Sequence, residues 1–257
     1  MSYFTRDDHH AVLSVQTGTP HGDAAMQRVY QRMLDLHRDL YPRLKKHGVE
    51  LYAIGDAAAA ITRSTASTPF AADVLTLSYL RERAEAVSVE RIMGRDEVML
   101  NGNLEAARHP VIEIRLSPDN LAVELLIAPS AWYDQQNFAG KMSINQHRLQ
   151  FYQLLARLGS DYLLGFWSGT YISSMHLEIG NLPPRRILFE FMDTFAARRD
   201  WLRVGCWYEP EAADLAPDRI ASTLFHRLRE LYPLYNFLTW SSSNNFQAFY
   251  QKMLARA

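Results

Sequence analysis

Apolar and polar residues alternate in several short segments of the chain, and this pattern predicts β-strands with two different faces. The alternation is clearest over residues 109–116 (HPVIEIRL) and 121–127 (LAVELLI). Between them, Pro118 suits the second position of a type I turn, and Asn120 tolerates a left-handed conformation. The two segments therefore predict a β-hairpin.

Two further predicted strands repeat nearly the same phrase. Residues 161–167 read DYLLGFW and residues 200–207 read DWLRVGCW, each with a glycine two positions before a tryptophan. The similarity indicates either an internal repeat of a helix-to-strand unit or the residues that any such connection favours. Strands are also predicted over 174–179 and 186–191, and 72–93 is interpreted as a strand followed by a helix.

Apolar residues spaced three and four apart predict amphipathic helices around these strands. The longest spans 23–46, with Gly48 as its C-terminal stop and Pro42 expected to kink or split it. Thr5 and Asp8 resemble a capping box at the start of an earlier helix. Further helices are predicted over 144–158, 193–199, 217–232 and 246–256, and a loop over 55–68.

Each predicted strand has an apolar row and an opposite row, because side chains alternate between the two faces of a strand. Strands of this kind belong to antiparallel sheets that carry helices on one face. We therefore expect an α+β protein with a curved, mainly antiparallel sheet and helices packed on one face. A single domain over residues 1–257 is expected, with a subdivision near 140–160 into two similar helix-strand halves as the alternative.

The opposite rows carry charged and aromatic side chains that would share the second face of one sheet. They are Trp167, Trp207, Glu113, Arg115, Glu124, His176, Glu178, Glu190 and Arg203. Such a face can be an ordinary solvated surface crossed by Glu–Arg pairs. It can also be a platform on which tryptophans stack a ring or a base while the charges select the ligand. We take these residues as candidate ligand-binding residues, and none as catalytic.

Composition narrows the range of functions. The chain carries 27 basic and 28 acidic side chains, so no overall field draws it to phosphate backbones or anionic lipid, and a nucleic-acid partner would need a local basic patch. The lone Cys206 excludes an intrachain disulfide, fits a reducing compartment and lies in an apolar row, where a buried, unreactive thiol is expected. Without a long apolar run, the protein is expected to be cytoplasmic and not membrane-bound.

Motifs for metals, nucleotides and nucleophiles are missing from the sequence. There is no HExxH, CxxC, GxSxG, Walker loop or GxGxxG, so no metal and no cofactor is predicted. The adjacent His9 and His10 point apart on a helix and are expected at the surface. One pattern leaves an enzyme open, because Glu113, Arg115, Asp119 and Glu124 loosely resemble the PD-(D/E)xK nuclease site, in which carboxylates hold magnesium. The order of the residues differs, and an arginine replaces the lysine.

Residues 232–246 (YPLYNFLTWSSSNNF) mix aromatic side chains with serine and asparagine. This composition is typical of a recognition surface, and equally of a helix end capped by serine and asparagine.

Three stretches resemble a known family. They are YFTRDDHHAV (3–12), LYPRLKKHGVEL (40–51) and HPVIEIRLSPDNLAVELLIAP (109–129), and they resemble a bacterial YktB-like family whose own function is uncharacterised. The resemblance covers at most the first half of the chain. It implies a curved α+β sheet and transfers no catalytic residue.

The sequence therefore predicts a non-catalytic binding or assembly protein that uses the second sheet face to bind a small molecule, a peptide or a nucleobase. The alternatives are a metal-dependent, nuclease-like hydrolase that uses the sheet carboxylates, and a homodimeric structural protein. Whether the chain catalyses a reaction stays open at this point.

Overall fold

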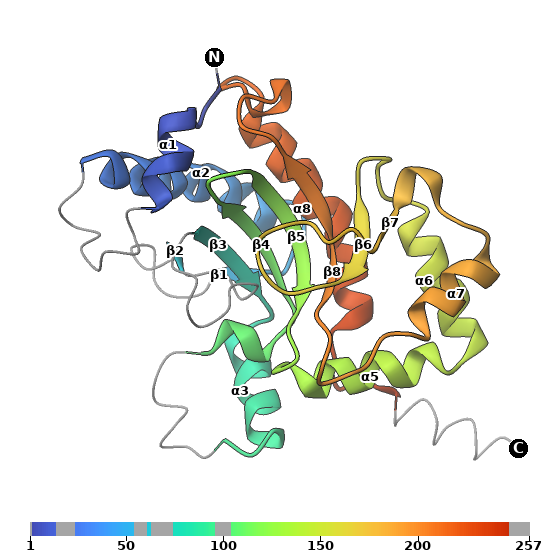
Figure 1. The fold of residues 1–257 in the computed structure, drawn as a ribbon. Helices are drawn as coiled ribbons and strands as arrows, with labels where there is room; N and C mark the ends of the chain where they lie inside the picture. The colour runs from blue at the N-terminus through green and yellow to red at the C-terminus, as the bar shows by residue number, and fades with distance from the viewer. Residues whose placement is uncertain (1, 14–23, 54–60, 63–73, 96–103, 247–257) are drawn as a thin grey trace, which may run out of the picture.

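An antiparallel sheet runs through the middle of the molecule (Figure 1). The computed structural model describes residues 2–13, 24–53, 61–62, 74–95 and 104–246. In spatial order the strands are β1 (Tyr52–Ala53), β3 (Leu75–Leu80), β4 (Val111–Leu116), β5 (Leu121–Ile127), β8 (Leu202–Tyr208), β6 (Leu163–Phe166) and β7 (His176–Glu178), and β2 (Ile61–Thr62) also pairs with β3. The predicted α+β class with a curved antiparallel sheet is confirmed.

The predicted hairpin is present as β4 and β5. Glu113 lies opposite Glu124 in the register, and the backbone N–H of Ser117 donates to the carbonyl of Asn120 at 2.9 Å across the turn. Next to it, β8 pairs with β5 on one side and with β6 on the other. The two similar phrases of the sequence therefore form neighbouring strands.

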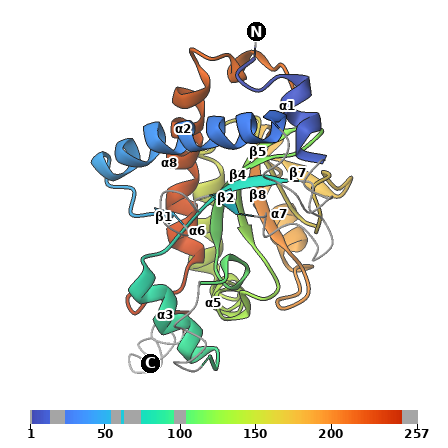
Figure 2. The ribbon, with the colours of Figure 1, turned by 90° about the vertical axis from the view of Figure 1, so that its left-hand side faces the viewer.

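Helices cover one face of this sheet (Figure 2). They are α2 (Ala24–Lys46), α5 (Trp132–Met142), α6 (Asn145–Leu155), α7 (Arg185–Met192) and α8 (Ile220–Leu238), and the short α1 (Arg6–Ala11) packs on α2. The apolar strand rows face them in one hydrophobic core, whose members include Ile112, Ile114, Val123, Leu125, Val204, Met33, Leu40, Leu224 and Leu228. Cys206 belongs to this core as a buried free thiol, and burial raises its pKa above the ordinary value. The predicted alternation therefore places the apolar rows correctly.

The other face is covered by loops and by one end of α3 (Arg83–Ile92). Ala86 of α3 packs there with Leu80, Val111 and Leu126. In Figure 1 the loop of residues 167–175, between β6 and β7, crosses in front of the sheet.

Two predicted helix ends are confirmed, whereas the split expected at Pro42 does not occur. Thr5 and Asp8 form the capping box, and Gly48 follows α2 with φ of +71°, a conformation that favours glycine. However, α2 continues through Pro42 to Lys46. Leu40 and Leu44 on either side of the proline are fully buried, and their packing holds the helix together despite the lost backbone hydrogen bond.

The strand predicted over 186–191 is wrong, because these residues lie in α7. Ile187, Phe189 and Phe191 do alternate, but the fully buried members of α7 are Leu188 and Met192, four positions apart. A short apolar run fits both periods, and Pro184 at the N-cap favours the helix. The helix predicted over 193–199 is wrong as well, since those residues form turns.

Other predictions differ mainly in their boundaries. The strand-then-helix interpretation of 72–93 is confirmed by β3 and α3, while α8 extends beyond its predicted end to Leu238. The helix α5 was not predicted. The helix predicted over 246–256 lies, apart from its first residue, outside the described residues, as does most of the loop predicted over 55–68, although Ile61–Thr62 of that loop form β2. His9, expected at the surface, is buried, with its Nδ1 2.7 Å from the carbonyl oxygen of Ser117.

Candidate functional site

Five of the predicted site residues meet on the sheet face that lies opposite the main helices. We call Arg115, Glu124, Arg203, Trp167 and Trp207 the arginine–tryptophan cluster. Arg115, Glu124 and Arg203 are each 0 % exposed, and Trp167 is 7 % exposed. The sequence therefore identifies residues that come together, but the interpretation of this face as an ordinary solvated surface is wrong.

Strand register explains why these side chains meet. On β5, Glu124 lies opposite Gly205 of β8, and Arg203 stands two residues before this glycine and so points to the same face. On its other side, Glu124 lies opposite Glu113 of β4. Arg115 follows Glu113 by two residues and so points to the same face. The two arginines therefore approach the Glu124 carboxylate from the two neighbouring strands.

The glycines in the two repeated phrases make room for this cluster. A Cβ atom at Gly205 would stand 2.5 Å from the Cβ of Glu124 and 2.6 Å from the backbone oxygen of Val123. A Cβ atom at Gly165, which lies opposite Arg203, would stand 2.6 Å from the ring of Trp167. Gly165 and Gly205 each lie on the same face as the tryptophan two residues later. The missing side chain of each glycine therefore leaves room on this face.

Glu124 is held between two guanidinium groups. Arg203 donates from Nε and Nη2 to the two carboxylate oxygens at 2.7 and 2.8 Å, and Arg115 donates from Nε at 3.0 Å. Burial raises the pKa of Glu124, but the charges and hydrogen bonds of Arg203 and Arg115 outweigh burial and hold this pKa below its ordinary value. Glu124 is therefore a fixed carboxylate that is poorly suited to proton transfer.

The two tryptophans pack on each other and on Arg203. Their ring centroids are 5.6 Å apart, and the Cζ atom of Arg203 lies 4.8 Å from the ring of Trp167 and 5.6 Å from that of Trp207. This is cation–π geometry in a buried setting, where such contacts are strongest.

Several buried hydrogen-bond donors of the cluster have no acceptor among the described residues. They are Nη1 and Nη2 of Arg115 and the indole Nε1 of Trp167 and of Trp207. Buried polar groups are almost always paired in folded proteins, with protein atoms or with ordered water. All four atoms are donors, so any partner they have must offer acceptor atoms.

The loop of residues 167–175 covers the cluster. The Nη1 atom of Arg203 donates to the carbonyl of Gly169 at 2.6 Å, and Gly169 has φ of +84°. Farther along the loop, the side chains of Tyr171 and Met175 are 70 % and 76 % exposed. The loop thus closes the site with its backbone and presents apolar side chains to solvent.

Glu113 lies beside the cluster on the same face, opposite Glu124, and the other predicted residues lie at the border of the cluster or away from it. His176 stands across Gly165 from Arg203, but its Nδ1 is 2.6 Å from the carbonyl oxygen of Ser173. Glu178, on the same strand, is exposed and accepts a hydrogen bond from Asn181. Glu190 is not on the sheet at all. It lies on α7, whose helical period places it in an exposed ion pair with Arg186.

The magnesium site suggested by the nuclease-like pattern does not fit the donor set. Glu124 is neutralised by two arginines that would repel a divalent cation, and Asp119 lies in the hairpin turn. Among the described residues there is no group of three His, Cys, Asp or Glu side chains placed to hold a metal ion. The sheet carboxylates therefore support ion pairing instead.

Sequence reasoning missed polar residues on β3 that join this face. Ser78 lies opposite Glu113, and its hydroxyl is 3.2 Å from the Glu113 carboxylate, with both residues buried. Thr76 lies opposite Arg115. The signal was present in the sequence, since Thr76 and Ser78 alternate with Leu75 and Leu77.

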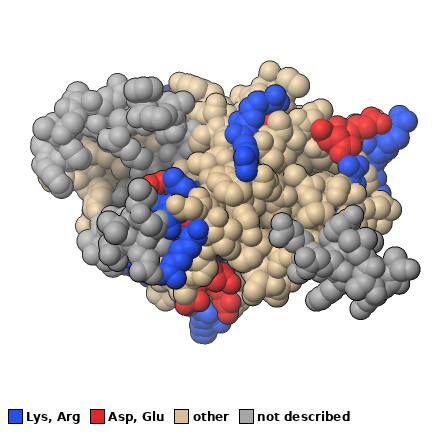
Figure 3. All heavy atoms as spheres, turned by 90° about the horizontal axis from the view of Figure 1, so that it is seen from below, with Lys and Arg blue, Asp and Glu red and all other residues tan. Residues whose placement is uncertain are grey.

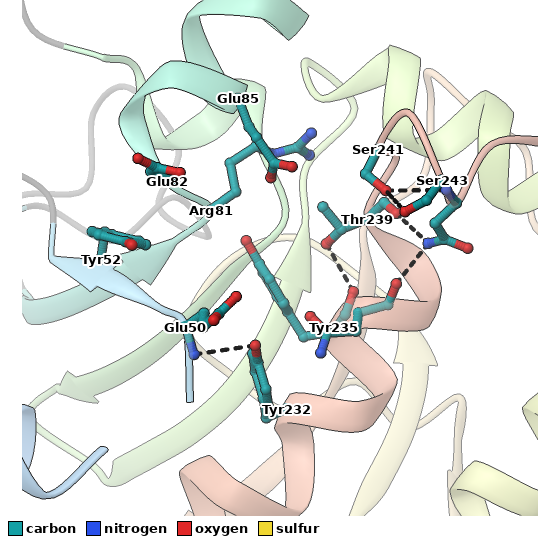
Figure 4. Close-up of a pocket in the computed structure, with 12 residues that line it drawn as sticks. Glu50, Tyr52, Arg81, Glu82, Glu85, Tyr232, Tyr235, Thr239, Ser241 and Ser243 are labelled. Atoms are coloured by element: carbon teal, nitrogen blue, oxygen red, sulfur yellow. Dashed lines mark hydrogen bonds between the residues drawn. The ribbon is translucent and has the colours of Figure 1, made fainter. Parts of the chain in front are cut away.

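A hollow of about 320 Å³ lies elsewhere, beside the C-terminal half of α8 (Figure 4). We call it the α8 pocket; it is lined by Glu50, Tyr52, Arg81, Glu82, Glu85, Tyr232, Tyr235, Asn236, Thr239, Ser241, Ser243 and Asn244. Asn244 caps the end of α8, since its Nδ2 donates to the carbonyls of Asn236 and Thr239 at 2.6 Å each. The aromatic and polar stretch 232–246 therefore contains a capped helix end that also forms one wall of a pocket.

Charged side chains form no broad basic surface in the view of Figure 3, where those of the described residues gather in small groups that often mix both signs. Within the described part of the chain, every helix is too short or too polar to span a bilayer. The chain matches none of the protein-family models against which it was scanned, and a search of curated proteins finds no similar sequence. The resemblance to a YktB-like family thus stays an expectation, and function is argued from the site.

Proposed function

We propose that this protein is a non-catalytic binding protein, and that the arginine–tryptophan cluster is its site for a small, planar anion that carries a carboxylate or a phosphate. The observation that carries the proposal is Arg115, whose two terminal nitrogens are buried without an acceptor among the described residues. A guanidinium fork of this kind matches the two oxygens of a carboxylate or phosphate.

The donors of the cluster favour a ligand with several acceptor oxygens. Arg115 and Arg203 both bond Glu124, and Glu113, opposite Glu124 in the register, is a second buried carboxylate on this face. Arg203 already uses all three of its nitrogens, on Glu124 and Gly169. Arg115 bonds Glu124 through Nε alone. A carboxylate or phosphate bound beside Arg115 would satisfy both terminal nitrogens.

The tryptophans favour a flat ligand. Two indoles beside the guanidinium provide ring faces for stacking, and their unpartnered Nε1 atoms can donate to further oxygens. Because the cluster is closed by the loop of residues 167–175, a long peptide fits less well than a small molecule. We infer that a ligand enters when this loop lifts and breaks the bond between Arg203 and Gly169.

A binding role accords with the state of the reactive groups. The Glu124 carboxylate is locked by two arginines, and Cys206 lies on the opposite, apolar face of the sheet with a raised pKa. Neither group resembles an activated acid, base or nucleophile.

Phenyl phosphate and benzoate test this proposal, with toluene-4-sulfonamide as an uncharged aromatic comparison. Both anions are expected to raise the melting temperature and to quench tryptophan fluorescence in a saturable way. In Arg115→Gln the affinity should fall about ten- to hundredfold, which is the effect of losing a hydrogen bond to a charged group of about 1.5–3 kcal/mol. Isothermal titration calorimetry at constant ionic strength gives the dissociation constants.

Two variants keep the result interpretable. Arg186→Gln removes an exposed arginine on α7 and should bind like the wild type. Arg115→Lys retains the charge without the fork and should bind with intermediate affinity. The proposal fails if neither anion stabilises the wild type, or if Arg115→Gln and Arg186→Gln bind alike.

A further inference from the structure

The α8 pocket is separate from the arginine–tryptophan cluster and has a different chemistry. We propose that it is a second binding site, for a small organic amine whose ammonium group lies among Glu50, Glu82 and Glu85 and whose other end presents an oxygen to Tyr235 and Arg81. This assignment does not depend on the function proposed for the cluster.

The rim of the pocket is acidic. Glu50, Glu82 and Glu85 are exposed and line the same hollow, and Lys45 is the nearby cation, with its Nζ 3.3 Å from the ring centroid of Tyr52. Three carboxylates against one ammonium leave a negative field at the mouth, which attracts a cation from solution.

The floor of the pocket holds buried polar atoms without partners. Tyr235 is 2 % exposed, and its hydroxyl has no hydrogen-bond partner among the described residues. The Nε of the buried Arg81 has none either. Figure 4 shows the Tyr235 hydroxyl pointing into the hollow, toward the side chain of Arg81. An oxygen between them would accept from both groups.

Arg81 does not make the floor cationic. Its Nη2 is 2.5 Å from an oxygen of Asp134 in a pair that is almost fully buried, and its Nη1 donates to the carbonyl of Trp240 at 2.9 Å. The pair is close to neutral, so the charge of the pocket is set by its rim. The donors at the floor therefore suit a neutral acceptor oxygen, such as that of an amide or an alcohol.

Aromatic walls suit the carbon chain and the ammonium group of such a ligand. The rings of Tyr232 and Tyr235 are stacked with centroids 6.4 Å apart, and Tyr52 lines the opposite side. The contact of Lys45 with Tyr52 shows that this wall accepts an ammonium group. A volume of about 320 Å³ is enough for a molecule of amino-acid size.

Three matched probes test the assignment: 6-aminohexanamide, hexanamide without the ammonium group, and hexylamine without the amide oxygen. Titrations followed by NMR should show saturable binding of 6-aminohexanamide with the shifted amide signals around the α8 pocket. Each incomplete probe should bind at least about fivefold more weakly, and the binding should weaken as salt is added.

Variants of the pocket provide the decisive comparison. Tyr235→Phe removes only the buried hydroxyl and leaves the core intact. It should lower the affinity for 6-aminohexanamide about two- to tenfold. The double variant Glu82→Gln/Glu85→Gln should lower the affinity for 6-aminohexanamide about tenfold. Glu190→Gln, on the exposed face of α7, should leave this affinity unchanged. The assignment is overturned if hexanamide binds as tightly as 6-aminohexanamide, if the shifted signals lie elsewhere, or if no probe binds because the hollow holds water alone.

Discussion

Gly205 has no side chain, and the arrangement of the cluster around Glu124 depends on this. The atoms that a Cβ would meet at this position are the Cα and Cβ of Glu124 and the oxygen of Val123, all on the neighbouring strand β5. Backbone atoms of a central strand cannot move away without disturbing the pairing of β5 and β8. The residue is therefore specified by close approach alone, because its backbone does not need a positive φ.

Gly205→Ala is expected to destabilise the protein by about 2–3 kcal/mol, because overpacking in a rigid interior typically costs about 1–3 kcal/mol. Gly94→Ala is the matched control, since Gly94 has φ of +88° but no neighbouring atom within 4 Å of the methyl group that alanine would add, and strain alone should cost about 1 kcal/mol. Urea unfolding gives both values. A smaller loss for Gly205→Ala than for Gly94→Ala would contradict the crowding argument.

Lys141 is a buried ammonium group that should make stability depend on pH in the alkaline range. Its Nζ donates to the carbonyl of Phe237 and to Oδ1 of Asn244, each at 2.5 Å, and burial lowers its pKa to about 8. In the unfolded chain lysine titrates near 10.5. Between these values the unfolded state binds more protons, so the free energy of unfolding rises with pH.

The Lys141 contribution is measured by comparing the wild type with Lys141→Met, which removes the titrating group. The free energy of unfolding of the wild type should increase relative to that of the variant between pH 8 and 10.5, by up to about 3 kcal/mol. Other titrating groups, including the tyrosines, are common to both proteins. A difference that stays constant over this range would show that Lys141 titrates normally.

At the scale of elements, the sequence predicted strands well where each face of the strand has its own composition. The rows of β4, β5 and β8 alternate over six or seven residues. The run 186–191 in α7 is also six residues long and alternates, but Leu188 and Met192 fit a helical period as well, so it was assigned wrongly. The helix α5 was missed because it buries polar side chains, among them Gln135, which donates to the carbonyl of Asp200.

The candidate site could be predicted in part for the same reason. Alternation puts Arg115 and Glu124 on one face of the predicted hairpin, whereas the pairing of β5 with β8, which brings Arg203 to Glu124, is seen only in the structure. The cover of residues 167–175 has no periodic pattern, and beyond Trp167 it contacts Arg203 through the backbone carbonyl of Gly169. The α8 pocket combines segments far apart in the chain, from Glu50 to Asn244, which no local pattern could have joined.

At the scale of the whole molecule, buried histidines join elements that are distant in the sequence. His9 of α1 contacts the β4–β5 turn through Ser117, and His37 of α2 lies 3.1 Å from the hydroxyl of Tyr79 on β3. Burial lowers the pKa of both histidines below 6.5. Folding therefore keeps them neutral, and acid should weaken the docking of the N-terminal helices on the sheet.

His9 shows why the charged form is disfavoured. Its Nδ1 faces a carbonyl oxygen and so carries the proton of the neutral ring, while the buried Nε2 has no partner among the described residues. A second proton would create an N–H group without an acceptor. Below pH 6.5, His9 binds a proton in the unfolded chain but stays neutral in the folded protein. The free energy of unfolding therefore falls as the pH falls from 6.5 toward the pKa of His9 in the folded protein.

The free energy of unfolding should therefore decline as the pH falls below about 6.5, and each such histidine should add a slope of up to about 1.4 kcal/mol per pH unit. In His9→Gln this slope should be reduced, because glutamine can still donate to Ser117 but does not titrate. His10→Gln, at the exposed neighbouring position, should keep the slope of the wild type. Unfolding in urea at half-unit steps of pH measures all three proteins, and equal slopes for the wild type and His9→Gln would show that His9 becomes charged in the folded protein as readily as in the unfolded chain.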